Sequence, residues 1–274
     1  MMSLLALLLL LLAPVAQAQP MSPWAQATTP TPGPARVIGT TTLGCLAGAV
    51  SLPPEGPGYQ AVRISRNRHW GHPDLIRFTR DLAARSRAAG NPDLWIGDLA
   101  QPRGGPMPSL HASHQSGLDV DIWLDLTPKP AASRAVREEL DVPSLVLPEQ
   151  TGVHARFTPA QARLIRLAAE APGVHLVLVN HGIKRSLCEM HRGEGWLHRV
   201  RPWRGHDSHM HIRIRCPAGS PDCREAIPIP AGDGCDASLE WWLSEDARRP
   251  PPRPRPPGPP PALPAACSGL LRVP

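Results

Sequence analysis

Histidines and aspartates gather in two short stretches that lie far apart in the sequence. The first runs from His111 to Ile122 (HASHQSGLDVDI) and the second from His206 to His211 (HDSHMH). Together they contain five histidines and three aspartates. Zinc enzymes commonly hold their ion through three side chains of these types and leave a fourth position for water. The two stretches therefore predict a catalytic metal site, with zinc as the expected ion.

Alternating polarity predicts that the first stretch continues as a strand. Between residues 117 and 124, apolar side chains take every second position, and Asp119 and Asp121 lie between them. This period is typical of a half-buried strand, and it places both carboxylates on one face. Asp121 can then reach a metal ion directly, while Asp119 could orient a ligand imidazole from behind.

The second stretch is predicted to form a strand of the same kind. Over residues 209–215, His209, His211 and Arg213 share one face, and the residues between them are apolar. Two such strands can direct side chains from distant parts of the chain toward a single point.

The spacing of these residues resembles the zinc signature of a known group of peptidases. His114 is followed seven residues later by Asp121, and the His-x-His of His209 and His211 lies downstream. The group unites lysostaphin-type endopeptidases, D-Ala-D-Ala peptidases and the sonic hedgehog fold.

Three longer blocks resemble one family of that group more closely. They are residues 65–73 (SRNRHWGHP), 111–122 and 200–213, and they occur in the order found in the penicillin-insensitive murein endopeptidases. The similarity runs from about residue 45 to residue 267. His-x6-Asp with His-x-His is weak evidence by itself, whereas three ordered blocks are specific.

The resemblance implies a zinc metalloendopeptidase whose partner is peptidoglycan (murein). Its expected reaction is hydrolysis of the cross-link between D-alanine and meso-diaminopimelate, although the residues themselves do not identify this substrate. The ion would polarise the scissile amide carbonyl and lower the pKa of its water from about 16 toward 7. The expected ligands are His111, His114, Asp121 and His211. Among them, His111 is either an additional ligand or only a neighbour.

Two further histidines are expected to act in catalysis. His209 shares a strand face with His211, so it can lie beside the ion without binding it and act as general base or stabilise the tetrahedral intermediate. His206 is the second expected catalytic residue. The chain has no Ser-x-x-Lys or Gly-x-Ser-x-Gly motif to supply a serine nucleophile. The resembling blocks also contain residues that either line the cleft or pack in the core: His69, Trp70, His72 and Trp203.

Two other functions compete with the endopeptidase. A D,D-carboxypeptidase would remove a terminal D-alanine and needs a cation to hold the free carboxylate, which several arginines could supply. A non-catalytic wall-binding module would be marked by loss of a metal ligand, but all the expected ligands are present. A closed structural zinc site is a weaker alternative, because such sites usually use four Cys or His ligands at tight spacing.

The N-terminal sequence indicates export. Residues 4–12 are leucine and alanine only, and an A-x-A cleavage signature follows at residues 16–18. The apolar run is too short to cross a bilayer, which takes about 20 residues. Residues 1–18 are therefore predicted to be a cleaved signal peptide, with an anchored N-terminal helix as the alternative. The mature chain is expected in the periplasm without a transmembrane segment.

Cysteine content and charge suit that compartment. Six cysteines allow three disulfides in 15 connectivities. The resemblance implies the pairs Cys45–Cys267, Cys188–Cys235 and Cys216–Cys223. The net charge of +6 favours polyanions such as anionic wall polymer or lipid headgroups. Nucleic acid is not an expected partner, because basic and aromatic residues are not interleaved as in base-stacking proteins.

The remaining sequence predicts one α+β domain over residues 36–247, with helices packed on a largely antiparallel sheet. Residues 19–35 are predicted to be a disordered lead-in, and the proline-rich residues 248–274 an extended strap. Strands are expected at 59–65, 94–99, 117–124, 174–179 and 209–215. Helices are expected at 73–89, 131–140, 159–169, 183–190 and 238–243.

Overall fold

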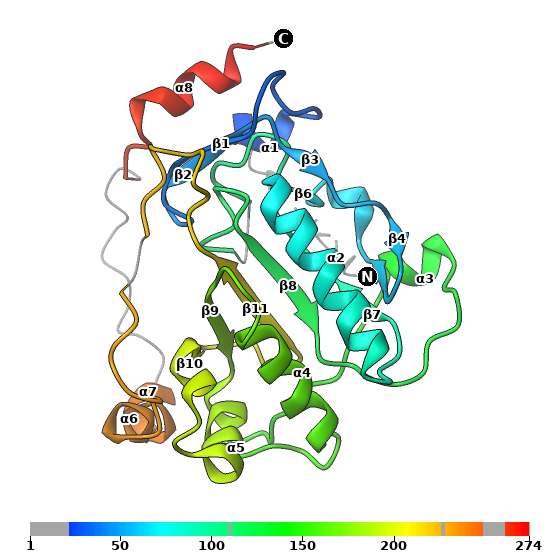
Figure 1. Ribbon diagram of the computed structural model, residues 1–274, viewed down its shortest axis with the longest axis vertical. Coiled ribbons are helices and arrows are strands. Elements are labelled where there is room, and N and C mark those ends of the chain that lie inside the picture. Colours follow the sequence, from blue (N-terminus) through cyan, green and yellow to red (C-terminus); the bar gives the residue numbers. More distant parts are fainter. Residues whose placement is uncertain (1–21, 109–110, 226–227, 249–260, 274) are drawn as a thin grey trace, which may run out of the picture.

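The structure is a computed structural model that describes residues 22–108, 111–225, 228–248 and 261–273 (Figure 1). The predicted signal peptide lies outside the described residues. In the described part of the chain, no helix has the length and apolar character needed to cross a membrane.

A seven-stranded sheet forms the centre of the described fold, in the order β10-β9-β11-β8-β7-β5-β4. Its central strands β9, β11, β8 and β7 are antiparallel, whereas β10 pairs with β9 and β5 pairs with β7 in parallel. The prediction of an α+β fold with a largely antiparallel sheet is confirmed. The strands are β4 (Glu55–Gly56), β5 (Tyr59–Ala61), β7 (Leu94–Ile96), β8 (Asp119–Trp123), β9 (Val174–Val179), β10 (Val200–Pro202) and β11 (His209–Ile214).

Shorter elements surround this sheet. The two-stranded ladders are β1 (Arg36–Gly39) with β2 (Gly44–Ala47), and β3 (Val50–Ser51) with β6 (Trp70–Gly71). The helices of the described residues are α1 (Pro23–Gln26), α2 (Pro73–Ala88), α3 (Arg134–Glu138), α4 (Pro159–Ala169), α5 (His181–His191), α6 (Ala237–Leu243), α7 (Glu245–Arg248) and α8 (Ala265–Leu271).

Helices α2 and α4 lie in front of the sheet in the view of Figure 1. The predicted capping box starts α4, because Thr158 caps the helix and its backbone N–H donates to Gln161 Oε1 at 2.9 Å. Pro73 begins α2, where a fixed φ suits the first turn. Both helices bury apolar side chains such as Leu75 and Leu164 in the core that the sheet also enters.

The two site strands are adjacent, but they are buried on both faces. In the ladder between β11 and β8, His211 lies opposite Asp121 and Arg213 lies opposite Asp119. The apolar side chains of these strands enter the core, and Asp119, Asp121, His211 and Arg213 are buried as well, while His209 at the strand end is partly exposed. The half-buried strands predicted from the alternation are therefore wrong for this face. Its polar groups tolerate burial because they pair with one another: Arg213 Nε donates to Asp119 Oδ1 at 2.7 Å.

Replacing Asp119 with alanine is expected to lower the free energy of unfolding by about 3–5 kcal/mol, because Arg213 would keep an unpaired buried charge. Burial opposes ionisation of Asp119, yet Arg213 and His211 hold the pKa of its carboxyl well below its usual range. The stabilisation is therefore present above the unfolded pKa of about 4 and is lost as the pH falls through the folded pKa. Urea unfolding at several pH values measures both effects.

The control for this prediction is Glu189→Ala. Glu189 accepts from Arg185 on the exposed face of α5, and such surface pairs contribute less than about 1 kcal/mol. Equal losses in the two variants at neutral pH would contradict the assignment of Asp119 as a buried structural charge.

The N-terminal segment is ordered from residue 22, so the predicted disorder is wrong over residues 22–35. Trp24 of α1 is buried against Ile38, Leu270 and the disulfide-bonded cysteines 45 and 267. The buried Arg103 donates to backbone carbonyls of both terminal segments. Burial of the Trp24 indole in this apolar cluster contributes free energy that offsets the entropy lost when the segment becomes ordered.

Three disulfides join Cys45 to Cys267, Cys188 to Cys235 and Cys216 to Cys223. They are the pairs that the family resemblance implies. The first disulfide fixes α8 against β2. This helix replaces the extended structure predicted for residues 265–271 of the strap, whereas residues 249–260 lie outside the described part.

Candidate metal centre and active site

Asp121 lies at the centre of a cluster of imidazoles from the loop before β8 and from β11. Its Oδ1 is 3.0 Å from His211 Nδ1 and 4.0 Å from His209 Nε2. Its Oδ2 is 3.4 Å from His114 Nε2 and 3.8 Å from His111 Nδ1. The fold therefore brings the two sequence stretches together at one carboxylate.

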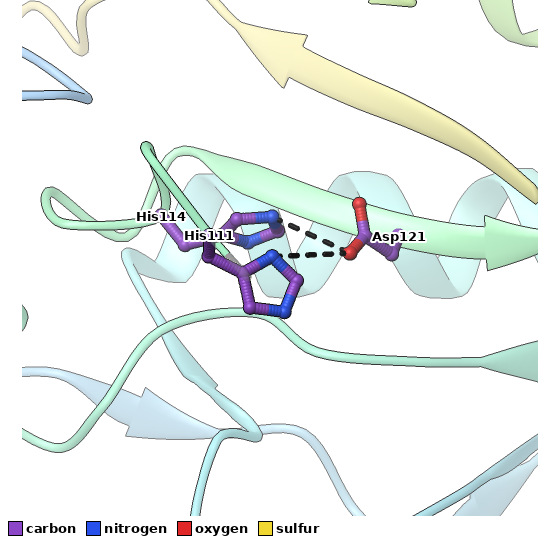
Figure 2. A group of neighbouring side chains, drawn as sticks. All are labelled: His111, His114 and Asp121. Atoms are coloured by element: carbon purple, nitrogen blue, oxygen red, sulfur yellow. Dashed lines mark ion pairs between the residues drawn. The ribbon is translucent and has the colours of Figure 1, made fainter. Parts of the chain in front are cut away.

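Three of these residues form a group that could hold a metal ion. The ligand atoms of His111, His114 and Asp121 all lie within 4.8 Å of one another. Figure 2 shows both imidazoles directed at the carboxylate of Asp121. His211 adjoins the group through its contact with the other oxygen of Asp121.

The loop before β8 holds His114 in an unusual backbone conformation. His114 has a φ of 66°, in the left-handed region that few residues other than glycine adopt. Its backbone N–H donates to Asp119 Oδ2 at 2.9 Å, and the next N–H, of Gln115, donates to Thr41 O at 3.0 Å. Asp119 thus fixes the loop while its other oxygen lies 3.3 Å from His211 Nε2.

The ring of His114 has the surroundings expected of a metal ligand. The side chain is almost fully buried, and neither of its ring nitrogens makes a hydrogen bond with a described residue. Buried polar atoms normally have hydrogen-bond partners. A cation beside Asp121 would supply the missing interaction, so the residues present fit a bound metal ion.

The charges of the cluster also suit a divalent cation. Burial favours the neutral form of Asp121, but the nearby imidazoles hold the pKa of its carboxyl well below the usual range. Burial likewise opposes protonation of His211, yet Asp119 and Asp121 raise its pKa to about 9. Without a metal ion, His211 is therefore protonated at neutral pH, and its positive charge lies between the two buried carboxylates.

His206 and His209 lie beside the cluster and differ from His211 in protonation. Burial lowers the pKa of His209. Burial, His209 and His211 lower the pKa of His206 to about 4. The rings of His206 and His209 are 5.0 Å apart, and His206 also has a left-handed backbone, with a φ of 53°. Both imidazoles are therefore neutral at pH 7 and able to accept a proton.

All six predicted site residues border one cavity of about 650 Å³. For His69, Trp70, His72 and Trp203, the sequence allowed a place either in the cleft or in the core. Trp203 lines this cavity, and the other three are not among its described lining residues. Arginines and tryptophans form much of the remaining wall: Arg63, Arg66, Arg201, Arg204, Trp203 and Trp242.

The comparison with known families identifies the group to which the chain is related. Residues 37–272 match the family model of penicillin-insensitive murein endopeptidases, a range that includes both site strands and the loop before β8. The chain belongs to this family. The resemblance inferred from three sequence blocks is thereby confirmed.

Individual members of the murein endopeptidase family align over most of the chain. The chain is 42% identical to the penicillin-insensitive murein endopeptidase of Haemophilus influenzae over 224 residues, which cover 80% of this chain and 78% of the relative. It is 41% identical to that of Klebsiella pneumoniae over 258 residues, which cover 91% of each chain. The relative from Yersinia pestis is 40% identical over 253 residues, covering 91% of this chain and 90% of its own.

Asp98 is a site residue of this family member that the sequence did not reveal. It follows β7, is buried, and its Oδ2 accepts from Arg68 at 3.0 Å and lies 2.9 Å from His111 Nε2. Burial opposes its ionisation, but His111 and Arg68 lower its pKa. The sequence offered one indication of an acidic partner here. Arg66 and Arg68 lie in the first block that resembles the family, and both guanidinium groups contact Asp98.

Replacing Asp98 with asparagine is expected to weaken metal binding by about 10- to 100-fold, because His111 would lose the carboxylate that orients its ring toward Asp121. Competition with a chromogenic chelator measures the affinity. Asp93→Asn is the matched control, since Asp93 lies just before the same strand and pairs with Arg87 instead. Equal affinities in the two variants would show that Asp98 does not support the site.

Proposed function

We propose that this protein is a periplasmic zinc endopeptidase that hydrolyses the D-alanyl–meso-diaminopimelyl cross-links of peptidoglycan. The observation that carries the proposal is the group of buried and partly buried imidazoles around Asp121, which borders a cavity in a chain of the murein endopeptidase family. The three disulfides suit an oxidising compartment, as does the predicted signal peptide.

The proposed metal ligands are His114, Asp121 and His211, with His111 as an additional ligand. His111 and His211 each present Nδ1 to Asp121 and Nε2 to a second carboxylate, that of Asp98 or Asp119. Metal-binding histidines typically have a carboxylate on the ring nitrogen that does not bind the metal. Bound zinc would polarise the scissile carbonyl and make a water nucleophilic at neutral pH.

His209 is proposed to move the protons of the reaction. Its neutral imidazole lies at the cavity wall beside Asp121, where it can take a proton from the attacking water and return it to the leaving amine. His206, whose ring packs against that of His209 and whose neutral imidazole can also accept a proton, is proposed as the second proton acceptor. Arg63 and Arg66 add positive charge to the same cavity, which suits a substrate rich in carboxylates.

Digestion of purified cross-linked muropeptide dimers tests the proposal. Monomers should appear, their formation should stop after metal chelation, and added zinc should restore it. A product shortened by one alanine would instead establish a D,D-carboxypeptidase. Binding of intact dimers by zinc-loaded protein without cleavage would establish a wall-binding module.

A further inference from the structure

Three tryptophans form an exposed aromatic surface beside the active-site cavity. Trp203 follows β10 and is 47% exposed, and Trp241 of α6 is 48% exposed. Trp242 lies between them, with its ring centroid 5.9 Å from that of Trp203 and 5.2 Å from that of Trp241. Trp203 and Trp242 also line the cavity that contains His209. We call these three residues the tryptophan platform.

The exposure of the tryptophan platform is unfavourable in water, and clustered exposed apolar residues usually mark a binding surface. Arg204 supports the cluster from the protein side. Its guanidinium lies 5.8 Å from the Trp242 ring centroid and donates to Ala247 O at 2.7 Å. The backbone N–H of Trp203 donates to Val179 O of the sheet at 2.9 Å. Trp242 also packs against the edge of the core, so the cluster is anchored while Trp203 and Trp241 stay about half exposed.

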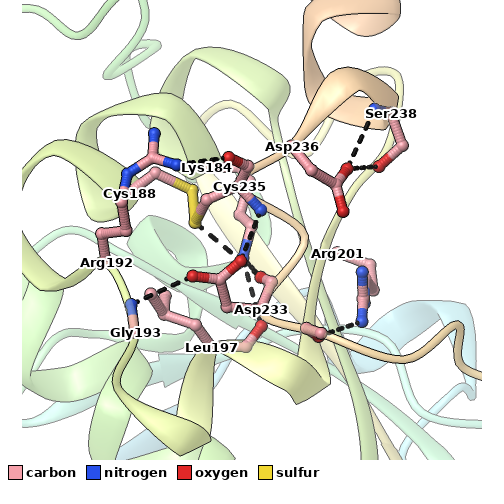
Figure 3. Close-up of a disulfide and its surroundings, with 11 residues drawn as sticks. Lys184, Cys188, Arg192, Gly193, Leu197, Arg201, Asp233, Cys235, Asp236 and Ser238 are labelled. Atoms are coloured by element: carbon pink, nitrogen blue, oxygen red, sulfur yellow. Dashed lines mark hydrogen bonds between the residues drawn. A yellow bond between two sulfur atoms is a disulfide. The ribbon is translucent and has the colours of Figure 1, made fainter.

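The segment leading into α6 is fixed by a second set of contacts, shown in Figure 3. The fully buried Lys184 donates from Nζ to Asp233 O at 2.6 Å and to Leu197 O at 3.1 Å. The Cys188–Cys235 disulfide ties the same segment to α5. Asp236 then caps α6 by accepting from Ser238 N at 2.9 Å. Trp241 and Trp242 are therefore presented by a rigid element, which lowers the entropic cost of binding.

We propose that the tryptophan platform binds the glycan strand of peptidoglycan by stacking pyranose rings on the indoles. A pyranose ring has an apolar C–H face and an edge of hydroxyl groups. Indole faces match the first, while the indole N–H groups match the second. Stem peptides lack large apolar side chains that would need so much aromatic surface.

This inference rests on the proposed function, because the length of the stem peptide sets how far the sugar can lie from the metal centre at Asp121. A stem peptide of about four residues spans at most about 14 Å when extended. A cross-link held at Asp121 must therefore keep its sugar close to the rim of the same cavity. The tryptophan platform occupies part of that rim.

The test compares two substrates that differ only in sugar. Cross-linked dimers that carry their disaccharides are assayed beside the same dimers after an amidase has removed the sugars. Trp241→Ala should lower kcat/KM on the sugar-bearing dimer by about five- to tenfold and leave the sugar-free dimer unchanged. Trp203→Ala also alters the wall of the active-site cavity, so it should lower kcat/KM on both dimers, with the larger loss on the sugar-bearing one. Trp203→Phe should keep most of the wild-type rate. Equal losses on both dimers, or no loss on either, would overturn the inference.

A binding measurement separates this inference from the proposed function. Wild-type protein titrated with an N-acetylglucosamine tetramer should show saturable quenching of tryptophan fluorescence, which Trp203→Ala and Trp241→Ala should weaken. Met190→Ala is the matched control, since Met190 is 45% exposed on α5 and does not line the cavity. Absence of binding to the wild type would reject the glycan site. Absence of cleavage of either dimer would reject the endopeptidase proposal and leave the binding result intact.

Discussion

The His211→Ala variant is expected to lose bound zinc and peptidoglycan hydrolysis together. In the wild type, Nδ1 of His211 lies 3.0 Å from Asp121 Oδ1, so the substitution removes a proposed ligand. The fall in metal affinity should exceed the about 10- to 100-fold cost of losing a group that only orients a ligand. Metal analysis of dialysed protein, together with the rate of muropeptide cleavage, measures both losses.

The control for His211→Ala is His154→Ala. His154 lies outside the cavity, and its Nδ1 accepts from the backbone N–H of Arg156. This variant should keep its metal and its activity. If His211→Ala retained zinc at the wild-type level, His211 would not be a ligand, and the proposed set would reduce to His111, His114 and Asp121.

Replacing His209 with alanine is expected to separate metal binding from catalysis. The variant should keep its zinc but lose about 10²- to 10⁴-fold in kcat, the usual contribution of a general base. Burial holds the pKa of His209 below its ordinary value of 6.5, so its neutral form is present at pH 7. Wild-type activity should therefore fall as the pH drops through that lowered pKa.

Two outcomes would contradict this role of His209. Loss of zinc from His209→Ala would make the residue a ligand. Retention of full activity would assign the proton transfer to another group, of which His206 is the nearest neutral imidazole at the same cavity.

The cluster around Asp121 was predictable from sequence because its determinants are local. A strand places alternate residues on one face, so Asp121 and His211 had to point the same way as Asp119 and Arg213. The family spacing then indicated that the two strands carry a shared site. The sequence did not show that this face is buried, because burial depends on the pairing of Asp119 with Arg213 across β8 and β11.

Other features depended on contacts between distant segments and could not be inferred. Asp98 looks like any residue at a strand end, and its role arises from His111 and Arg68 in other segments. The composition of residues 19–35 predicted disorder, yet Trp24 packs in one apolar cluster with Leu270 from the opposite end of the chain. The helix at residues 238–243 was expected, but the exposure of Trp241 follows only from how α6 docks.

Locating the metal ion directly tests the central claim. Crystals of zinc-loaded protein measured on both sides of the zinc absorption edge should show one anomalous peak bound by His114, Asp121 and His211, with His111 as an additional ligand. A zinc peak away from Asp121, or a zinc-free site in catalytically active protein, would contradict the account.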